Sequence, residues 1–258
     1  MMRAALAVEL LKMRRSRVVA VASALMVVLM PALAAGFMAA YLAGGDSQLS
    51  AKVSTMITGS TWSDYLGLMA QLLSVGAFLG VGFVVSWVFG REYSDGTIGS
   101  LYALPVSRDR IAWAKGLLVL GWGCAASVLA AVVAVPIGLV IGLDGPAGVD
   151  DIARAVALPV TVAVLTTLLA LPLALVASAG RGYLPAVAAL IGIVVVTQVV
   201  TVFGAGAWFP WAAPGLWSGM GGAELASSVT PVQLALPVLV GVLGLWATAA
   251  WWQRAEVV

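Results

Sequence analysis

Six long apolar segments separated by short polar ones dominate this chain of 258 residues. The basic residues are distributed unevenly, because eleven of the thirteen fall in every second polar gap: Arg3, Lys12, Arg14, Arg15, Arg17, Arg91, Arg108, Arg110, Lys115, Arg181 and Arg254. Lysine and arginine close to membrane spans are retained on the cytoplasmic side. The pattern therefore predicts six transmembrane helices with both termini in the cytoplasm.

Composition supports the same architecture. The chain is 62% hydrophobic and only 9% charged, whereas a soluble domain carries about 25% charged residues. A membrane-spanning helix needs about 20 apolar residues, and this length predicts spans at 18–42, 65–89, 116–143, 155–180, 183–203 and 230–252. We expect an all-α, multi-pass protein of the inner or plasma membrane, with residues 18–258 as one transmembrane domain.

Several kinds of chemistry lack their residues. The sequence has no histidine and one cysteine, Cys124, so histidine acid–base catalysis and histidine-ligated metal sites are excluded. It contains no GxxxxGK[ST] phosphate-binding loop. The basic residues are a topology signal, so no nucleic-acid partner is expected. We expect no catalytic residues, no metal and no cofactor bound by this chain.

The first 17 residues are expected to form a helix on the inner membrane surface. One arc of a helical wheel is apolar and comprises Met2, Leu6, Leu10 and Met13. Glu9, Lys12 and Arg15 lie on the opposite arc, where the cations would lie near anionic headgroups. The alternative is a basic leader that only orients the first span.

The inner segment between the second and third spans carries the most information. Ser94 or Asp95 is expected to cap a short helix. Ile98, Leu101 and Tyr102 would share one face of this helix and form an exposed apolar knob for a docking partner. The alternative is an amphipathic turn that faces lipid.

The same segment is expected to turn at a proline. Leu104-Pro105 ends the short helix, because proline disfavours helical geometry in the residue before it. Ser107 would then cap the helix of the third span, and Asp109 would complement its positive end.

Residues 204–229 are neither a span nor an ordinary loop, because three tryptophans and two prolines interrupt them: Trp208, Trp211, Trp217, Pro210 and Pro214. One interpretation is a re-entrant hairpin that dips into the outer leaflet and is covered by neighbouring helices. The other is an aromatic-rich loop that lies on the headgroups.

None of the predicted spans holds a charged residue near its centre. The polar residues inside the spans are therefore uncharged ones. Gln71, Thr167 and Gln198 are the candidates for lining a translocation path. The alternative is that these side chains make hydrogen bonds that pack helices together.

Two blocks carry a resemblance to a known family. Glu9-Leu-Leu-Lys-Met-Arg-Arg-Ser and Arg91-Glu-Tyr-Ser-Asp-Gly-Thr-Ile, the latter followed by Leu104-Pro-Val-Ser-Arg and Lys115, resemble the membrane subunits of ABC-2 type exporters. The chain is most similar to the small permeases of the bacitracin-resistance and lantibiotic-immunity group. The resemblance implies that the first segment is a connecting helix and that 96–104 is a coupling helix. The implied ATPase-docking residues are Glu92, Asp95, Gly96, Thr97, Ile98, Leu101, Tyr102, Leu104, Pro105, Ser107 and Arg108.

The resemblance also implies partners and a mechanism. A separate pair of ATP-binding cassette subunits would bind ATP and Mg²⁺, and a second copy or a related permease would complete the route. ATP-driven alternating access would export an apolar or amphipathic substrate, such as an antibiotic, a peptide or a lipid-like compound. The alternatives are a secondary transporter, which needs an ionisable intramembrane site, and an intramembrane enzyme, which needs a catalytic constellation.

Overall fold

The computed structural model describes residues 2–44, 48–54, 57, 59–103, 105–144 and 148–255. All regular secondary structure in these residues is helical. Six segments among them are long and apolar enough to cross a membrane: Arg17–Ala43, Trp62–Ser94, Arg108–Ile141, Asp150–Ala179, Tyr183–Val202 and Pro231–Arg254. The prediction of an all-α protein with six spans is therefore confirmed. Leu104 lies outside the described residues.

The first span consists of three consecutive pieces. It contains α2 (Arg17–Ala24), a π-helical turn η1 (Leu25–Leu29) and α3 (Met30–Ala43). Pro31 has no amide hydrogen to donate to the preceding turn, and the π turn lies directly before it. The helix therefore crosses the bundle with a local widening at its proline.

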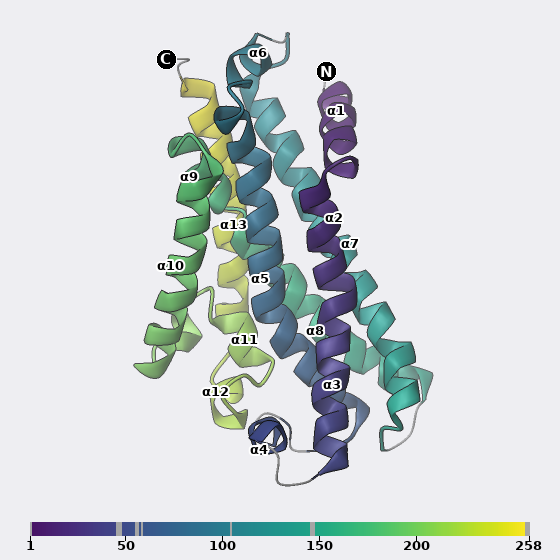
Figure 1. Ribbon diagram of the computed structural model, residues 1–258. Helices are drawn as coiled ribbons and strands as arrows, with labels where there is room; N and C mark the ends of the chain where they lie inside the picture. Colours follow the sequence, from purple (N-terminus) through teal and green to yellow (C-terminus); the bar gives the residue numbers. More distant parts are fainter. Residues whose placement is uncertain are drawn as a thin grey trace.

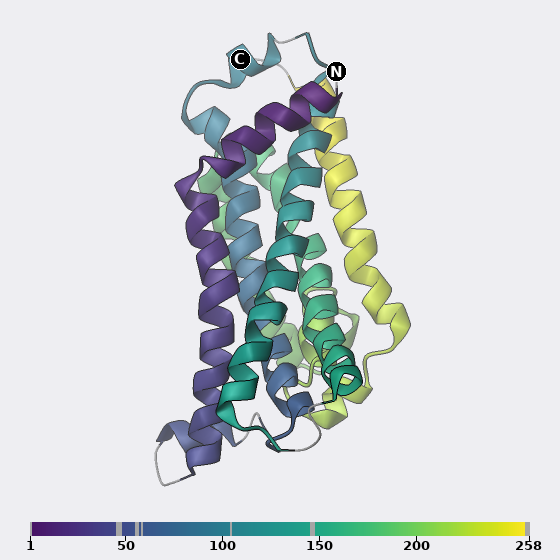
Figure 2. The same cartoon turned by 90° about the vertical axis from the view of Figure 1, so that its right-hand side faces the viewer.

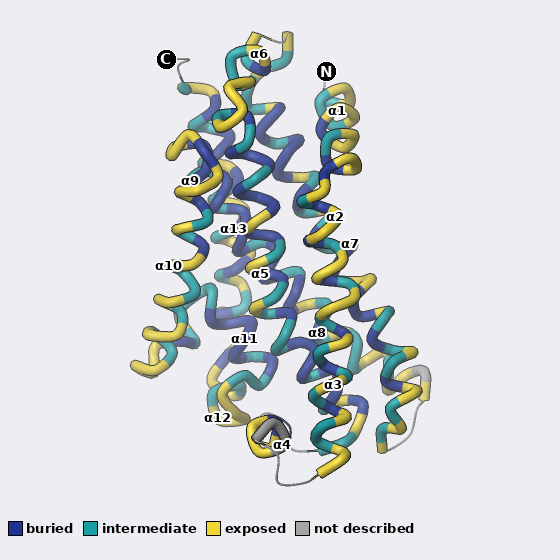
Figure 3. Tube along the Cα trace, in the orientation of Figure 1, coloured by how far each residue is buried: buried dark blue, intermediate teal, exposed yellow. Residues whose placement is uncertain are grey.

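The helix α5 (Trp62–Ser94) lies in the centre of the bundle, beside α8 (Val149–Ala170) (Figures 1 and 3). Pro172 separates α8 from α9 (Leu173–Ala179) within the same span. In the most apolar window of α5 56% of the residues are buried, against 11% for α10 (Tyr183–Val202). Apolar side chains on α10 thus face outward, where lipid would surround a membrane protein.

One close backbone contact holds α10 against α5. A Cβ atom added at Gly90 would lie 2.3 Å from the amide nitrogen of Tyr183, which is the first residue of α10. Only glycine lets the two backbones approach so closely.

Both termini lie at the same end of the bundle (Figure 1). This end also carries α1 (Met2–Arg14) and α6 (Ile98–Tyr102), the short helix between α5 and α7 (Arg108–Ile141). Figure 2 shows that α1 crosses this end at a steep angle to the spans. The opposite end carries α4 (Gln48–Val53) and α12 (Ala223–Ser227). Both termini lie at one end because the chain crosses the bundle an even number of times.

The segment between the last two spans folds back into the bundle. It contains η2 (Gly206–Trp208), α11 (Ala213–Trp217) and α12, and it leads to α13 (Pro231–Arg254). The α11 residues Ala213, Pro214, Gly215 and Leu216 are buried. Trp211 Nε1 donates a hydrogen bond of 3.1 Å to the carbonyl of Leu169 in α8. The structure favours the re-entrant hairpin over a loop on the surface.

Candidate functional site

The link between α5 and α7 begins one turn later than the sequence predicts. The α5 helix continues through Ser94, and Asp95 is its C-cap. Gly96 follows with φ of 68°, its amide donates to the carbonyl of Tyr93, and the amide of Thr97 donates to that of Glu92. These two bonds form a Schellman motif, which ends a helix at a left-handed glycine. The prediction that Ser94 or Asp95 caps α6 is therefore wrong; its N-cap is Thr97.

The α6 helix buries the face that was expected to be an exposed knob. Leu101 is 8% exposed and belongs to the hydrophobic core, and Ile98 and Tyr102 are half-buried. The Tyr102 ring packs edge-on against Trp252 with centroids 5.6 Å apart, and its hydroxyl lies 3.0 Å from that of Tyr93. The prediction of an exposed knob is wrong, because the tip of α13 supplies an aromatic surface that covers this face.

Further contacts attach the link to the ends of the spans. The Arg108 guanidinium lies 4.4 Å above the Tyr102 ring and also donates to the carbonyl of Ala255. Ser107 is the N-cap of α7, as predicted, but its side chain makes no capping hydrogen bond. Among the described residues of the link, the exposed ones are small or polar: Asp95, Gly96, Thr97, Ser100, Ala103, Pro105 and Ser107.

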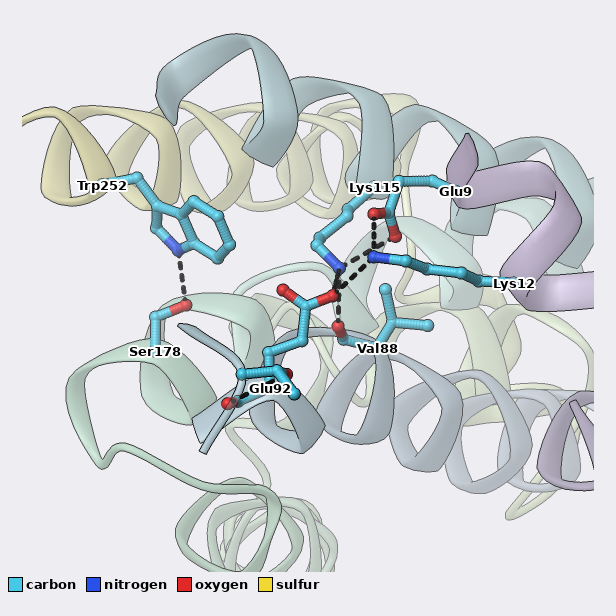
Figure 4. Close-up of polar contacts among 8 residues, drawn as sticks. Glu9, Lys12, Val88, Glu92, Lys115, Ser178 and Trp252 are labelled. Carbon is cyan, nitrogen blue, oxygen red and sulfur yellow. Dashed lines mark hydrogen bonds and ion pairs between the residues drawn. The ribbon is translucent and has the colours of Figure 1, made fainter. Parts of the chain in front are cut away.

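Four charged side chains from three helices meet beneath this link: Glu9 and Lys12 of α1, Glu92 of α5 and Lys115 of α7 (Figure 4). We call these residues the charge quartet. Lys115 Nζ lies 2.9 Å from Glu9 Oε2 and 3.0 Å from Glu92 Oε1, and Lys12 Nζ lies 2.7 Å from Glu9 Oε1 and 2.8 Å from Glu92 Oε1. Lys115 Nζ also donates to the carbonyl of Val88. Two lysines and two glutamates make the quartet neutral.

Three members of the quartet are almost entirely removed from solvent, and the fourth, Lys12, has a side chain that is 29% exposed. Lys115 is 1% exposed, Glu92 3% and Glu9 4%. An isolated charge at such a depth is strongly unfavourable, whereas paired charges with several hydrogen bonds are tolerated. Burial lowers the pKa of Lys12, but hydrogen bonds and the charges of Glu9 and Glu92 outweigh this effect and raise it overall. Lys12 therefore remains charged at neutral pH.

The quartet turns toward the bundle a face of α1 that combines residues of the expected polar and apolar arcs. Glu9 and Met13 face the protein, whereas Val8, Leu10 and Leu11 are between 44% and 52% exposed. Glu9 and Lys12 of the expected polar arc form ion pairs with α5 and α7, whereas Arg15 of the same arc is exposed. Lys115 and Glu92 lie buried at the ends of their spans and need opposite charges, which α1 supplies. Sequence reasoning missed Lys115, although acidic residues among basic segments are a signal for such pairing.

A groove of about 550 Å³ runs between α1 and α6 above the quartet. Ala5 and Val8 of α1 line one side, and Leu101, Pro105 and Val106 of the link line the other. Glu9, Lys12 and Glu92 also contribute to its lining. The groove thus offers an apolar slot with charged groups at its base, at the end of the molecule that carries both termini.

A second cavity, of about 180 Å³, lies between α5, α8, α10 and α11. Gln198, Ser74 and Trp211 line it. Gln71 faces the neighbouring hairpin, since a Cβ atom at Gly219 would lie 3.5 Å from its Nε2. Thr167 does not line the cavity: it is fully buried, donates to the carbonyl of Ala163 and packs near Gly123, while its neighbour Thr166 lines the cavity. The structure thus brings Gln198 and Gln71 to the same region but not Thr167.

These features define a multi-pass helical membrane protein. At one end its α5–α7 link is held against the ends of the spans, and a cavity with polar lining residues lies among the spans. Residues 5–204 match the family model described as ABC-2 family transporter protein. The chain belongs to this family and is a membrane permease of the ABC exporter type. It is also 26% identical over 197 residues to the bacitracin transport permease protein BCRB of Bacillus licheniformis. The matched region covers 76% of this chain and 92% of that relative. Family membership implies partnership with an ATP-binding cassette subunit.

Proposed function

We propose that this chain is the membrane half of an exporter whose ATPase subunit docks on the exposed side of the α5–α7 link and on the α1–α6 groove. The observation that carries the proposal is that the charge quartet joins α1, α5 and α7 directly beneath the link. A force applied at this surface would reach three helices together.

The chemistry of the docking surface supports a protein partner. The outward residues Thr97, Ser100 and Ala103 are small or polar, so another chain can approach the backbone of α6 closely. Val8 lines the groove and is 52% exposed, so an apolar side chain of the partner would be buried against it. We expect the resemblance-derived docking residues to act through this outward side, while Leu101 and Tyr102 hold α6 in place.

The mechanism follows from how rigidly the link is held. Closure of a pair of ATPase subunits would displace α6, and the quartet would transmit this displacement to α1, α5 and α7 as a rigid-body tilt. Alternating access would then result from the changed packing of α5 against its neighbours. A second copy of the chain or a related permease would supply the other wall of the route.

The cavity among the spans supports an uncharged or amphipathic substrate. Its lining combines apolar side chains with the hydroxyls of Ser74 and Thr166 and the amide of Gln198, and includes no charged residue among those described. The relative named as a bacitracin transport permease suggests an antibiotic of that kind as the cargo, and a lipid-like compound would also fit this lining.

The experiment is purification of the full-length chain from its own membranes in mild detergent, with the bound proteins identified by mass spectrometry. We expect an ATP-binding cassette subunit with a phosphate-binding loop to co-purify. Ser100→Trp should abolish this association, because the bulky ring would stand on the docking surface. Ser227→Trp, at an exposed position of α12 at the opposite end, is the matched control and should retain the subunit.

Two results would contradict the proposal. Retention of the ATPase subunit by the Ser100→Trp protein would move the docking site elsewhere. Transport driven by an ion gradient in vesicles that contain only this chain would make it a secondary transporter.

A further inference from the structure

We propose that the groove between the first span and α5 binds one anionic glycerophospholipid of the inner leaflet, with its phosphate at Arg17 and one acyl chain along the helices. The groove has a volume of about 600 Å³ and is separate from the docking surface and from the cavity among the spans. The inference does not depend on the proposed ATPase partner.

The shape of the groove follows from the spacing of residues on α5. Gly76 and Gly80 lie one turn apart and have no side chains, whereas Leu79 and Phe83 stand beside them and are 41% and 43% exposed. Met26 and Met30 of the first span pack onto these two glycines, so the first span lies close to α5, and Leu79 and Phe83 flank the groove that remains beside it. The opposite wall is formed by α2, the π turn η1 and the first residue of α3, and Leu190 of α10 also contributes to the lining. Three of the lining residues belong to the π turn: Leu25, Met26 and Leu29.

The length of the groove fits one leaflet. Its wall on the first span extends from Arg17 to Met30, which corresponds to about 20 Å of helix at 1.5 Å per residue. One leaflet of the hydrocarbon core is about 15 Å thick. An acyl chain that begins at the level of Arg17 would therefore remain in the groove across the full thickness of the leaflet.

Charge identifies the head of the ligand. Arg17 is the one charged residue among those described along the groove, and it lies at the end of the span that joins α1. Arg14 and Arg15 precede it and are exposed, and no ion pair joins any of the three to an acid in the described part of the chain. Glu9, the acid of this segment, is already paired with Lys12 and Lys115. These exposed cations can therefore pair with an external anion, and a lipid phosphate at the membrane surface supplies one.

The same charges disfavour a second copy of the chain as the occupant. A two-fold dimer places the same surface patch of both copies face to face. A dimer centred on this groove, with its axis along the membrane normal, would bring two uncompensated Arg17 side chains to the same depth. Like charges at short distance repel, so a lipid is the better complement.

The test uses the purified full-length chain in mild detergent, titrated with phosphatidylglycerol or phosphatidylcholine of identical acyl chains and observed by native mass spectrometry. We expect wild type to bind one phosphatidylglycerol in preference to phosphatidylcholine. Arg17→Gln should weaken phosphatidylglycerol binding about fivefold and remove most of its preference over phosphatidylcholine, whose net charge is zero. Arg3→Gln, which removes an exposed cation of α1 outside the groove, should behave like wild type.

A second pair of variants tests the acyl-chain part of the groove. Val21 lines the groove and is 59% exposed, whereas Val28 is 60% exposed on the same span but does not line it. Val21→Trp should abolish binding of both lipids, and Val28→Trp should not. The proposal is overturned if Arg17→Gln and Arg3→Gln bind phosphatidylglycerol equally. It is also overturned if Val21→Trp retains the lipid but converts a dimer into monomers, because the groove would then be a subunit interface.

Discussion

At the scale of single residues, the charge quartet is the most consequential feature of this protein. Lys115 lies near the N-terminal end of α7 with 1% exposure, a position where a lone ammonium group would be strongly destabilising. Glu9 reaches it from a different helix, 106 positions earlier in the chain. The position of α1 is therefore fixed by charge neutralisation as well as by apolar packing.

We predict that the quartet is energetically coupled. Glu9→Gln or Lys115→Met alone should each lower the free energy of unfolding by about 3 kcal/mol, because each leaves an uncompensated buried charge. The double variant restores neutrality and should cost clearly less than the sum of the two. Denaturant unfolding of the purified chain in detergent, analysed as a double-mutant cycle, measures the coupling.

The ion pair between Arg154 and Asp151 provides the control. Its side chains are 79% and 48% exposed and lie 3.3 Å apart, so Arg154→Gln should change stability by less than about 1 kcal/mol. Strict additivity of the Glu9 and Lys115 effects would contradict the structure, because independent residues show no coupling.

At the scale of elements, the ends and contacts of helices depend on local backbone chemistry. Gly96 ends α5 through a Schellman motif, and Pro172 separates α8 from α9. The helix α5 buries more of its surface than α10 because its neighbours surround it. At Gly90 the backbone of α5 closely approaches the start of α10.

We predict opposite effects for the same substitution on these two helices. Gly90→Ala should destabilise the protein by about 1–3 kcal/mol, because the added methyl group would overlap the backbone of Tyr183. Gly192→Ala in α10 meets no atom within 4 Å, so it should be neutral or stabilising by up to about 1 kcal/mol. Thermal unfolding in detergent compares the two, and equal melting temperatures would refute the close contact.

At the scale of the whole molecule, the two ends differ in what they carry. One end carries both termini, α1 and α6, and the other carries α4 and α12 (Figure 1). The distribution of the basic residues predicts that the first end faces the cytoplasm.

We predict that a membrane-impermeant maleimide applied to intact cells labels Ser227→Cys and not Ser100→Cys, both in a Cys124→Ala background. Ser100 lies on α6 and Ser227 on α12, and both are exposed. Ser100→Cys should be labelled only after the membrane is permeabilised. The reverse pattern would invert the topology.

We also predict that the cavity among the spans is reached by water from the outer side. In the same background, Gln198→Cys should react with the impermeant reagent, because Gln198 lines the cavity. Val195→Cys is the control, since Val195 is 56% exposed on the same helix but does not line the cavity. Thr167→Cys should remain unlabelled because Thr167 is fully buried. Equal labelling of all three positions would contradict a defined cavity.

The sequence by itself determined the spans, because an apolar run of about 20 residues has one stable environment and needs no tertiary information to be recognised. The distribution of lysine and arginine likewise predicted that both termini share one side. The short helix α6 and the N-cap at Ser107 were also predictable, since their signals are local.

The tertiary structure alone decided which faces of the short helices point inward. A helical wheel assigned the apolar arc of α1 to one side, but buried charges on α5 and α7 turned Glu9 toward the bundle. The aromatic tip of α13 likewise covered the face of α6 that was expected to be open. Periodicity reports only which residues share a face, whereas burial depends on partners that lie up to 150 positions away in the chain.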